Sequence, residues 1–144
     1  MRARAGRLGI AGDVVFAGWR RRPADWIAGA SACVVPSRHD AWSQTAVLAM
    51  ALGVPVVGSA VEGLEHVLSG GRGIAVAPED PQALARALAS VLQGHVRTDL
   101  QAARRYAAKF TAERVADLYE QTYTELLGRP PTFADTAAPQ SRAC

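Results

Sequence analysis

Apolar residues gather in four short runs that do not alternate with polar ones. A strand with one face in water alternates between apolar and polar residues, whereas a strand covered on both faces is apolar throughout. The four runs therefore predict strands buried on both faces. They are residues 14–16, 32–35, 54–57 and 73–76.

Segments with helical patterns separate these runs. They cover residues 23–30, residues 43–52 and a shorter stretch around residues 63–68. Strands that alternate with helices are joined by right-handed crossovers and pair in parallel. We therefore expect one α/β domain, Rossmann-like, with a parallel sheet of at least four strands.

The chain after the fourth run is predicted to be helical. Asp80 is a good N-cap, and an apolar face follows it until Gly94 ends the helix. A second helix is expected over residues 98–108, and a third from Thr111 to Gly128.

These elements define the expected domain organisation. Residues 1–127 are interpreted as one domain of the Rossmann type. Residues 128–144 are rich in Pro, Thr, Ala and Ser, so we expect a disordered tail there.

Composition narrows the class of protein. Of 144 residues, 49% are hydrophobic and 20% are charged, as in globular domains. The net charge is +3, but the arginines are scattered rather than set in a stripe, so no nucleic-acid partner is expected. Cys33 and Cys144 make neither a disulfide framework nor a metal set. No signal peptide or long apolar span is visible, and we expect a cytoplasmic protein.

The loop at residues 37–42 is the strongest candidate for a binding site. Ligands of open parallel sheets bind at the carboxyl ends of the strands. This loop leads directly into a predicted helix whose first turn contains Ser43, Gln44 and Thr45. Free backbone N–H groups and the positive end of a helix dipole favour an anion such as a diphosphate.

Simpler interpretations of the same residues remain open. Asp40 could only cap the following helix, and Trp42 could be a core residue at the helix entrance. Arg20 could belong to a solvated loop. His39 and His66 lack partners at metal-ligand spacing, so no metal is expected.

The stretch from Pro36 to Val57 resembles the signature of group 1 glycosyltransferases, the family-four class with the GT-B fold. Those proteins typically read Pro-Ser, a Glu-Gly-Phe-Gly-like turn, Glu-Ala-Met-Ala, a glycine and Pro-Val-Val. The counterparts here are Pro36-Ser37, Asp40-Ala41-Trp42-Ser43, Leu48-Ala49-Met50-Ala51, Gly53 and Pro55-Val56-Val57. The resemblance covers roughly Gly9 to Leu127 and implies the C-terminal, donor-binding half of a GT-B protein. It thereby implies that residues 1–127 are a partial nucleotide-sugar-binding domain.

The resemblance also implies roles for single residues. Asp40 takes the place of the family's first acidic residue, which contacts the donor sugar. Ala41 and Trp42 lie in the turn that lines the sugar. The amides of Ser43, Gln44 and Thr45 would hold the diphosphate of the donor.

Three further positions come from the same resemblance. Trp19 and Arg20 lie where the family often holds the base of the nucleotide. Leu48 stands eight positions after Asp40, where the family has a glutamate that binds the ribose hydroxyls. A leucine cannot accept those hydrogen bonds, and about 1.5–3 kcal/mol of charge-assisted interaction is missing.

The implied activity is the retaining transfer of a sugar from a nucleoside diphosphate sugar to an acceptor, without a cofactor. The family's basic diphosphate ligands and its N-terminal acceptor domain have no counterpart in this sequence. The chain alone is therefore expected to be inactive, and a peripheral membrane acceptor would fit the full-length enzyme. A noncatalytic sugar-nucleotide-binding or interaction module is the main alternative, and an epimerase of the same fold ranks below it.

Overall fold

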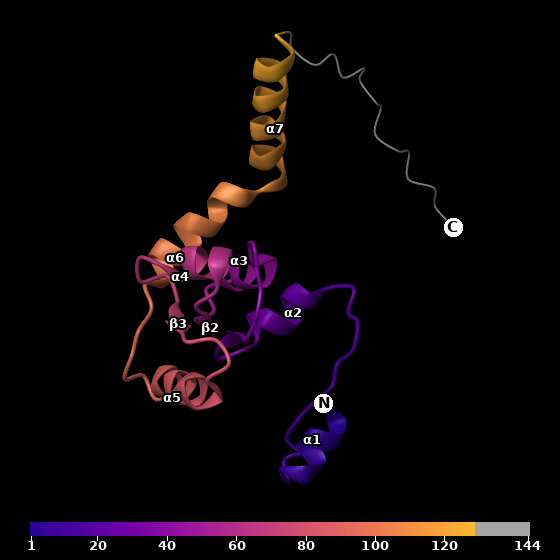
Figure 1. Ribbon diagram of the computed structural model, residues 1–144, viewed down its shortest axis with the longest axis vertical. Coiled ribbons are helices and arrows are strands. Elements are labelled where there is room, and N and C mark those ends of the chain that lie inside the picture. Colours follow the sequence, from indigo (N-terminus) through magenta and orange to yellow (C-terminus); the bar gives the residue numbers. More distant parts are fainter. Residues whose placement is uncertain (129–144) are drawn as a thin grey trace, which may run out of the picture.

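A computed structural model describes residues 1–128 of the chain (Figure 1). All but the first residue of the expected tail lies outside the described residues. The strands are β1 (Cys33–Val35), β2 (Val56–Ser59) and β3 (Ile74–Val76). The helices are α1 (Arg2–Arg7), α2 (Pro23–Ala28), α3 (Gln44–Ala51), α4 (Glu62–Leu68), α5 (Pro81–Leu92), α6 (Leu100–Ala107) and α7 (Ala112–Leu127), with a 3₁₀ turn η1 (Ala108–Phe110) between the last two.

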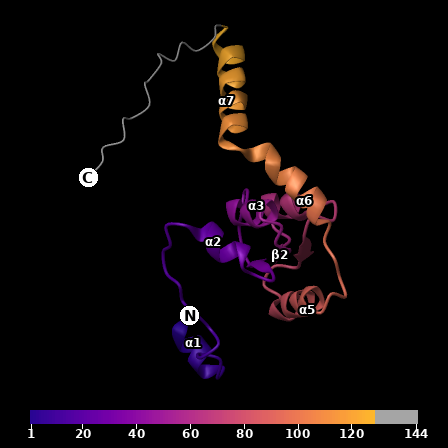
Figure 2. The same ribbon diagram turned by 180° about the vertical axis from the view of Figure 1, so that it is seen from behind.

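The three strands form one parallel sheet in the order β1-β2-β3. Val34 pairs with Val57 and Gly58 pairs with Ala75, so the predicted α/β class and parallel pairing are confirmed. Both crossovers run in the same direction across the sheet, and right-handed crossovers then place α3 and α4 on the same face. Figures 1 and 2 show α5 on the opposite side.

The prediction of burial on both faces is right for β2 alone. All four of its residues are buried. In the described part of the chain β1 and β3 are the edge strands, where Val34 is 36% exposed and Ala75 is also exposed. An unalternated apolar run therefore indicates a strand of a parallel sheet without indicating whether it is central.

The hydrophobic core lies between the sheet and the layer formed by α3, α4 and α6. Met50, Leu64 and Leu68 are its largest fully buried side chains. Burying a side chain of this size stabilises the fold by about 1.5–3 kcal/mol. α6 packs on α3 through Ala103 and Ala107, which are both buried and small enough to let the two helices approach closely.

Residues 14–16 do not form the predicted first strand. Val15 is 76% exposed, and the segment runs between α1 and α2 apart from the sheet (Figure 1). In the doubly wound order 3-2-1-4-5-6, three consecutive strands that are also neighbours in the sheet correspond to strands 4, 5 and 6. The strand before them in the chain is then strand 3, which lies at the edge of the sheet and pairs with strand 2. The described residues contain no first or second strand of that order, so residues 14–16 have no partner. The observed sheet accordingly has three strands and not four.

The helices after β3 begin and end close to the predicted signals. Asp80 caps α5 by accepting hydrogen bonds from two first-turn amides at 3.0 and 2.8 Å. α6 begins at Leu100 because Asp99, and not Thr98, caps it by accepting from an amide of the first turn at 2.8 Å. Gly128 ends α7 with a φ of 61°, a conformation that glycine adopts without strain.

Helix α7 extends away from the rest of the described chain (Figures 1 and 2). It leaves large apolar side chains exposed, among them Leu118, Tyr119 and Leu126. No helix within residues 1–128 is long and apolar enough to cross a membrane.

Candidate functional site

Residues 36–43 connect the carboxyl end of β1 to the amino end of α3. Ser43 closes this loop: it is 4% exposed, and its Oγ accepts a hydrogen bond from the amide of Ala46 at 3.4 Å. The amides of a helix's first turn have no acceptor within the helix. The hydroxyl of Ser43 accepts from Ala46, and the amides of Gln44 and Thr45 are therefore available to a ligand at the positive end of α3.

Asp40 lies half-buried in the same loop. The hydroxyl of Ser37 donates to its Oδ2 at 3.2 Å. The cap of α3 is Ser43, so the simpler interpretation of Asp40 as the capping residue does not describe this loop. Its carboxylate keeps further lone pairs with which it can accept hydrogen bonds from a ligand.

The amino end of α4 contacts this loop directly. The amide of Asp40 donates to Glu62 Oε2 at 3.4 Å, and Glu62 Oε1 lies 3.7 Å from Nδ1 of His39. A Cβ atom at Gly63 would overlap the carbonyl oxygen of Ala41. Residues 39–41 are thus held against α4 by a side chain and by a close backbone approach.

The side chain of Trp42 joins the loop to the C-terminal helices. Its ring packs on Phe110 with 4.9 Å between centroids, and Phe110 packs on Tyr106 at 5.0 Å. The guanidinium of Arg72 lies 4.1 Å from the centroid of Tyr106. Trp42 is still 37% exposed, so it both packs at the helix entrance and leaves part of its ring open to solvent.

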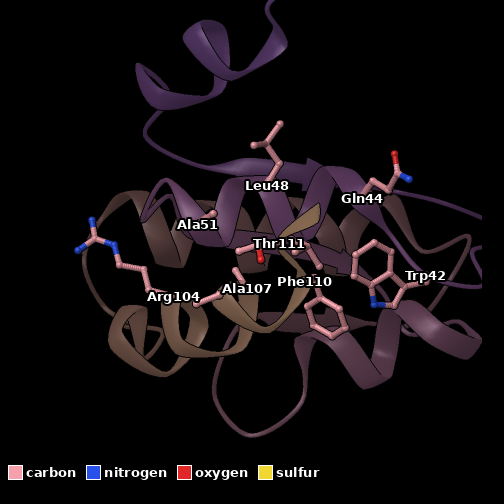
Figure 3. A pocket seen from close by; sticks show the side chains of 10 residues that line it. Trp42, Gln44, Leu48, Ala51, Arg104, Ala107, Phe110 and Thr111 are labelled. Carbon is pink, nitrogen blue, oxygen red and sulfur yellow. The ribbon is translucent and has the colours of Figure 1, made fainter. Parts of the chain in front are cut away.

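A trough of about 480 Å³ lies between α3 and the α6–η1 segment (Figure 3). Figure 3 shows Arg104 at one end of it and Trp42 with Gln44 at the other. Its remaining lining is mostly apolar and consists of Val47, Leu48, Ala51, Ala107, Ala108, Phe110 and Thr111. Three of the predicted site residues, Trp42, Gln44 and Leu48, therefore share one cavity.

A second cavity, of about 320 Å³, lies at the carboxyl ends of all three strands. It reaches from Pro36 after β1 to Ser59 at the end of β2 and Val76 at the end of β3. Arg38 and Glu79 pair across it at 3.0 Å. Both cavities therefore border the loop that contains Asp40, because Trp42 lines the trough and Pro36 and Arg38 line the second cavity.

The thiol of Cys33 lies in β1, just before this loop. Burial raises the pKa of Cys33, which favours the neutral thiol. A neutral thiol is a poor nucleophile, so burial disfavours covalent catalysis by Cys33.

Comparison with known proteins identifies the family. Residues 1–94 match the family described as "Glycosyl transferases group 1". The chain belongs to the group 1 glycosyltransferases. The resemblance inferred from Pro36 to Val57 is thereby confirmed.

Two relatives in this glycosyltransferase family are much longer than the chain. D-inositol 3-phosphate glycosyltransferase 2 of Catenulispora acidiphila is 38% identical over 131 residues, which cover 85% of this chain and 31% of that protein. The lipopolysaccharide core biosynthesis mannosyltransferase LpsB of Rhizobium meliloti is 27% identical over 130 residues, or 83% of this chain and 37% of that protein. The chain thus spans about a third of the length of these relatives.

Solved structures agree on the GT-B fold. Sucrose-phosphate synthase from Thermosynechococcus elongatus superimposes with a TM-score of 0.79 at 31% identity, covering 88% of this chain and 33% of that one. Anabaena Alr3699/HepE, solved in complex with UDP, gives a TM-score of 0.73 at 23% identity over 88% of this chain and 35% of that one. The chain therefore has the architecture of the C-terminal half of a GT-B glycosyltransferase.

Two predicted site residues of this glycosyltransferase chain lie apart from the others. Trp19 is 82% exposed, and Arg20 stacks its guanidinium on the ring of Trp26 at 5.1 Å. Trp19 and Arg20 belong to the segment that follows residues 14–16, whose strand does not form here, and they line neither the trough nor the carboxyl-edge cavity. Asp40, Ala41, Ser43 and Thr45 line neither cavity either, but they lie in the loop and the first turn of α3, next to residues that do.

Sequence reasoning placed Glu62, Gly63, Ser59 and Glu79 in the loops at the ligand-binding edge but assigned none of them to the site. A signal existed for all four, because each follows or ends a predicted strand at the ligand-binding edge of the sheet. What the sequence does not show is that α4 folds back against the loop of Asp40.

Proposed function

We propose that this chain forms the donor-binding wall of a retaining glycosyltransferase that transfers a sugar from a nucleoside diphosphate sugar to an acceptor. The observation that carries the proposal is the loop of residues 37–45. It places a half-buried carboxylate, Asp40, next to free amides at the positive end of α3. Family membership supplies the reaction class.

The diphosphate would lie against the amides of Gln44 and Thr45. Unsatisfied N–H groups and the dipole of α3 stabilise negative charge there, and this charge grows on the leaving diphosphate during transfer. The carboxylate of Asp40 would accept hydrogen bonds from sugar hydroxyls or steady positive charge that develops at the anomeric carbon. Ala41 and Trp42 would line the sugar.

The nucleoside would use apolar contact more than hydrogen bonds. The trough that begins at Trp42 offers an aromatic ring and the side chain of Leu48, and neither can accept a bond from a ribose hydroxyl. HepE was solved with UDP and, in another structure, with UDP-glucose, which favours uridine donors as the first probes. The proposal needs no cofactor besides the donor substrate, and we place the chemistry in the cytoplasm.

Transfer by the chain alone is not part of the proposal. In a GT-B enzyme the reaction takes place in a cleft between two domains, whose closure aligns the acceptor and excludes water. The missing N-terminal acceptor domain is the partner that we propose for catalysis.

A noncatalytic module, either a degenerate sugar-nucleotide-binding domain or an interaction domain, is the second candidate. Leu48 favours it, because that side chain removes an acid expected to hold the ribose. Such a module would bind nucleotides weakly or not at all and would gain no activity from an added acceptor domain.

Calorimetry with UDP-glucose, GDP-mannose and ADP-glucose tests the proposal. We expect one of these donors to bind the 144-residue chain, and we expect Ser43→Pro, which disturbs the first turn of α3, to abolish that binding. The matched control is Ser90→Ala, on α5 and away from both cavities. Binding that is equal in the wild type and Ser43→Pro would contradict the assignment of the site.

A further inference from the structure

The side chain of Glu62 contacts the loop of Asp40 and does not cap its own helix. α4 begins at Glu62, and its N-cap, Val61, makes no side-chain capping bond. A glutamate in the first turn commonly serves the free amides there. Here one carboxylate oxygen accepts from the amide of Asp40 and the other lies near His39.

The backbone of Glu62 is held in an unusual conformation. Its φ is 21°, which places a residue with a side chain in the region that favours glycine. Such a conformation is unfavourable for a residue with a side chain and persists only where the surroundings impose it. In this structure the surroundings of Glu62 include the loop of residues 39–41, which Glu62 and Gly63 both contact.

Gly63 is a glycine for reasons of space. Its φ lies outside the left-handed region, so its backbone suits other residues, but a Cβ atom would overlap the carbonyl of Ala41. Gly29 is a useful contrast, because it also has an ordinary φ and nothing lies within 4 Å of the place of its Cβ.

We propose that Glu62 and Gly63 are positioning residues that clamp residues 39–41 and thereby fix Asp40 relative to the first turn of α3. The clamp consists of the bond from the Asp40 amide to Glu62 and the close packing of Gly63 on Ala41. Its consequence for donor affinity rests on the proposed function. The clamp itself is a property of the loop and can be measured without a ligand.

The hydrogen bond between Asp40 and Glu62 and the packing of Gly63 on Ala41 should hold the loop more strongly than the ion pair between His39 and Glu62. The side chains of His39 and Glu62 are 89% and 63% exposed, and ion pairs between exposed groups contribute little. Loss of one hydrogen bond corresponds to about a three- to tenfold change in an equilibrium.

The first experiment measures amide hydrogen exchange in the chain without ligand. We expect Glu62→Ala to speed exchange of the Asp40 amide about three- to tenfold, and Glu62→Gln to restore most of the protection, because its amide oxygen still accepts. Glu65→Ala, on the exposed side of the same helix, is the control and should change nothing at residues 39–41. Equal loss in Glu62→Ala and Glu62→Gln, or no loss in either, overturns the clamp.

The second experiment measures the affinity for UDP-glucose in the same variants and in Gly63→Ala. We expect Glu62→Ala and Gly63→Ala to weaken binding about three- to tenfold or more, while Glu62→Gln, Glu65→Ala and Gly29→Ala stay near the wild type. Unchanged affinity in Gly63→Ala, with the fold intact by circular dichroism, overturns the role of Gly63. A wild-type chain that binds no nucleotide sugar would refute the proposed function alone, since the exchange experiment still decides whether the clamp exists.

Discussion

The side chain of Leu48 lies half-buried in the wall of the trough, where the family resemblance places a glutamate. Leu48→Glu would supply a carboxylate able to accept hydrogen bonds from ribose hydroxyls. We expect UDP-glucose to bind about tenfold more tightly, since a charge-assisted hydrogen bond is worth about 1.5–3 kcal/mol and the partly buried acid must also be desolvated. Isothermal calorimetry measures the change.

Ala51→Glu is the matched control for that substitution. Ala51 lies on the same helix and lines the same trough, so the variant adds the same charge without the proposed contact to ribose. Equal affinities of Leu48→Glu and Ala51→Glu would show that this chain holds the nucleoside in another way.

Asp40 provides a second prediction at the residue scale. Asp40→Asn keeps an oxygen that can accept from Ser37 but removes the negative charge. We expect affinity for UDP-glucose to fall about tenfold, while affinity for UDP is unchanged, because the carboxylate is assigned to the sugar. Competition binding with both nucleotides checks this, and a similar loss for both would move Asp40 from the sugar to another part of the ligand.

Sequence reasoning reached some of these residues and not others. The capping and loop patterns located Ser43, Gln44 and Thr45, because a helix start is encoded within a few neighbouring positions. It placed Glu62 and Gly63 at the same edge of the sheet but gave them no role, since their contacts with residues 39–41 arise only when α4 packs against the loop. A cap is determined by neighbouring residues and can be predicted from the sequence, but the contact between α4 and the loop depends on how the whole sheet assembles.

At the scale of elements, the helices were predicted more successfully than the strands. Caps such as Asp80 and the apolar face of α5 are properties of the segment itself, and the structure follows them. Residues 14–16 have a similar apolar pattern to β1 but remain unpaired, because a strand needs a neighbour to satisfy its backbone groups. The apolar pattern indicates that a segment can pair as a strand, but a strand forms only where a partner strand is present.

The start of α7 has a pH dependence that can be tested. Hydrogen bonds from the backbone of Glu113 and from Thr111 hold the pKa of Glu113 below its ordinary value. A depressed pKa in the folded state means that the carboxylate stabilises the helix above the pKa of the unfolded chain, about 4.3, and that this contribution is lost as the pH falls through the folded value. We expect the helical Cα chemical shifts of residues 112–115 to weaken between about pH 5 and pH 3 in the wild type. In Glu113→Gln this part of the change should disappear, and identical titrations of both proteins would contradict the assignment.

At the scale of the whole molecule, we propose that the chain supplies one wall of a two-domain cleft. It spans about a third of its relatives, 31% in the case of the Catenulispora protein. We expect no release of UDP from UDP-glucose by the isolated chain above that of Ser43→Pro, because no second wall positions an acceptor or excludes water. A coupled diphosphate-release assay measures this, first with the chain alone and then with the N-terminal half of a relative added. Turnover by the chain alone would show that one wall is sufficient.

The order of strands in the sheet equals their order along the chain. As a nascent chain leaves the ribosome, β1, α3 and β2 can therefore assemble from consecutive residues before the rest has been made. α6 is synthesised much later, yet Ala103 and Ala107 are what cover the side of α3 that packs against α6. Until α6 has been made, this apolar surface is open to solvent, so the early β1-α3-β2 unit exposes surface that the finished fold buries.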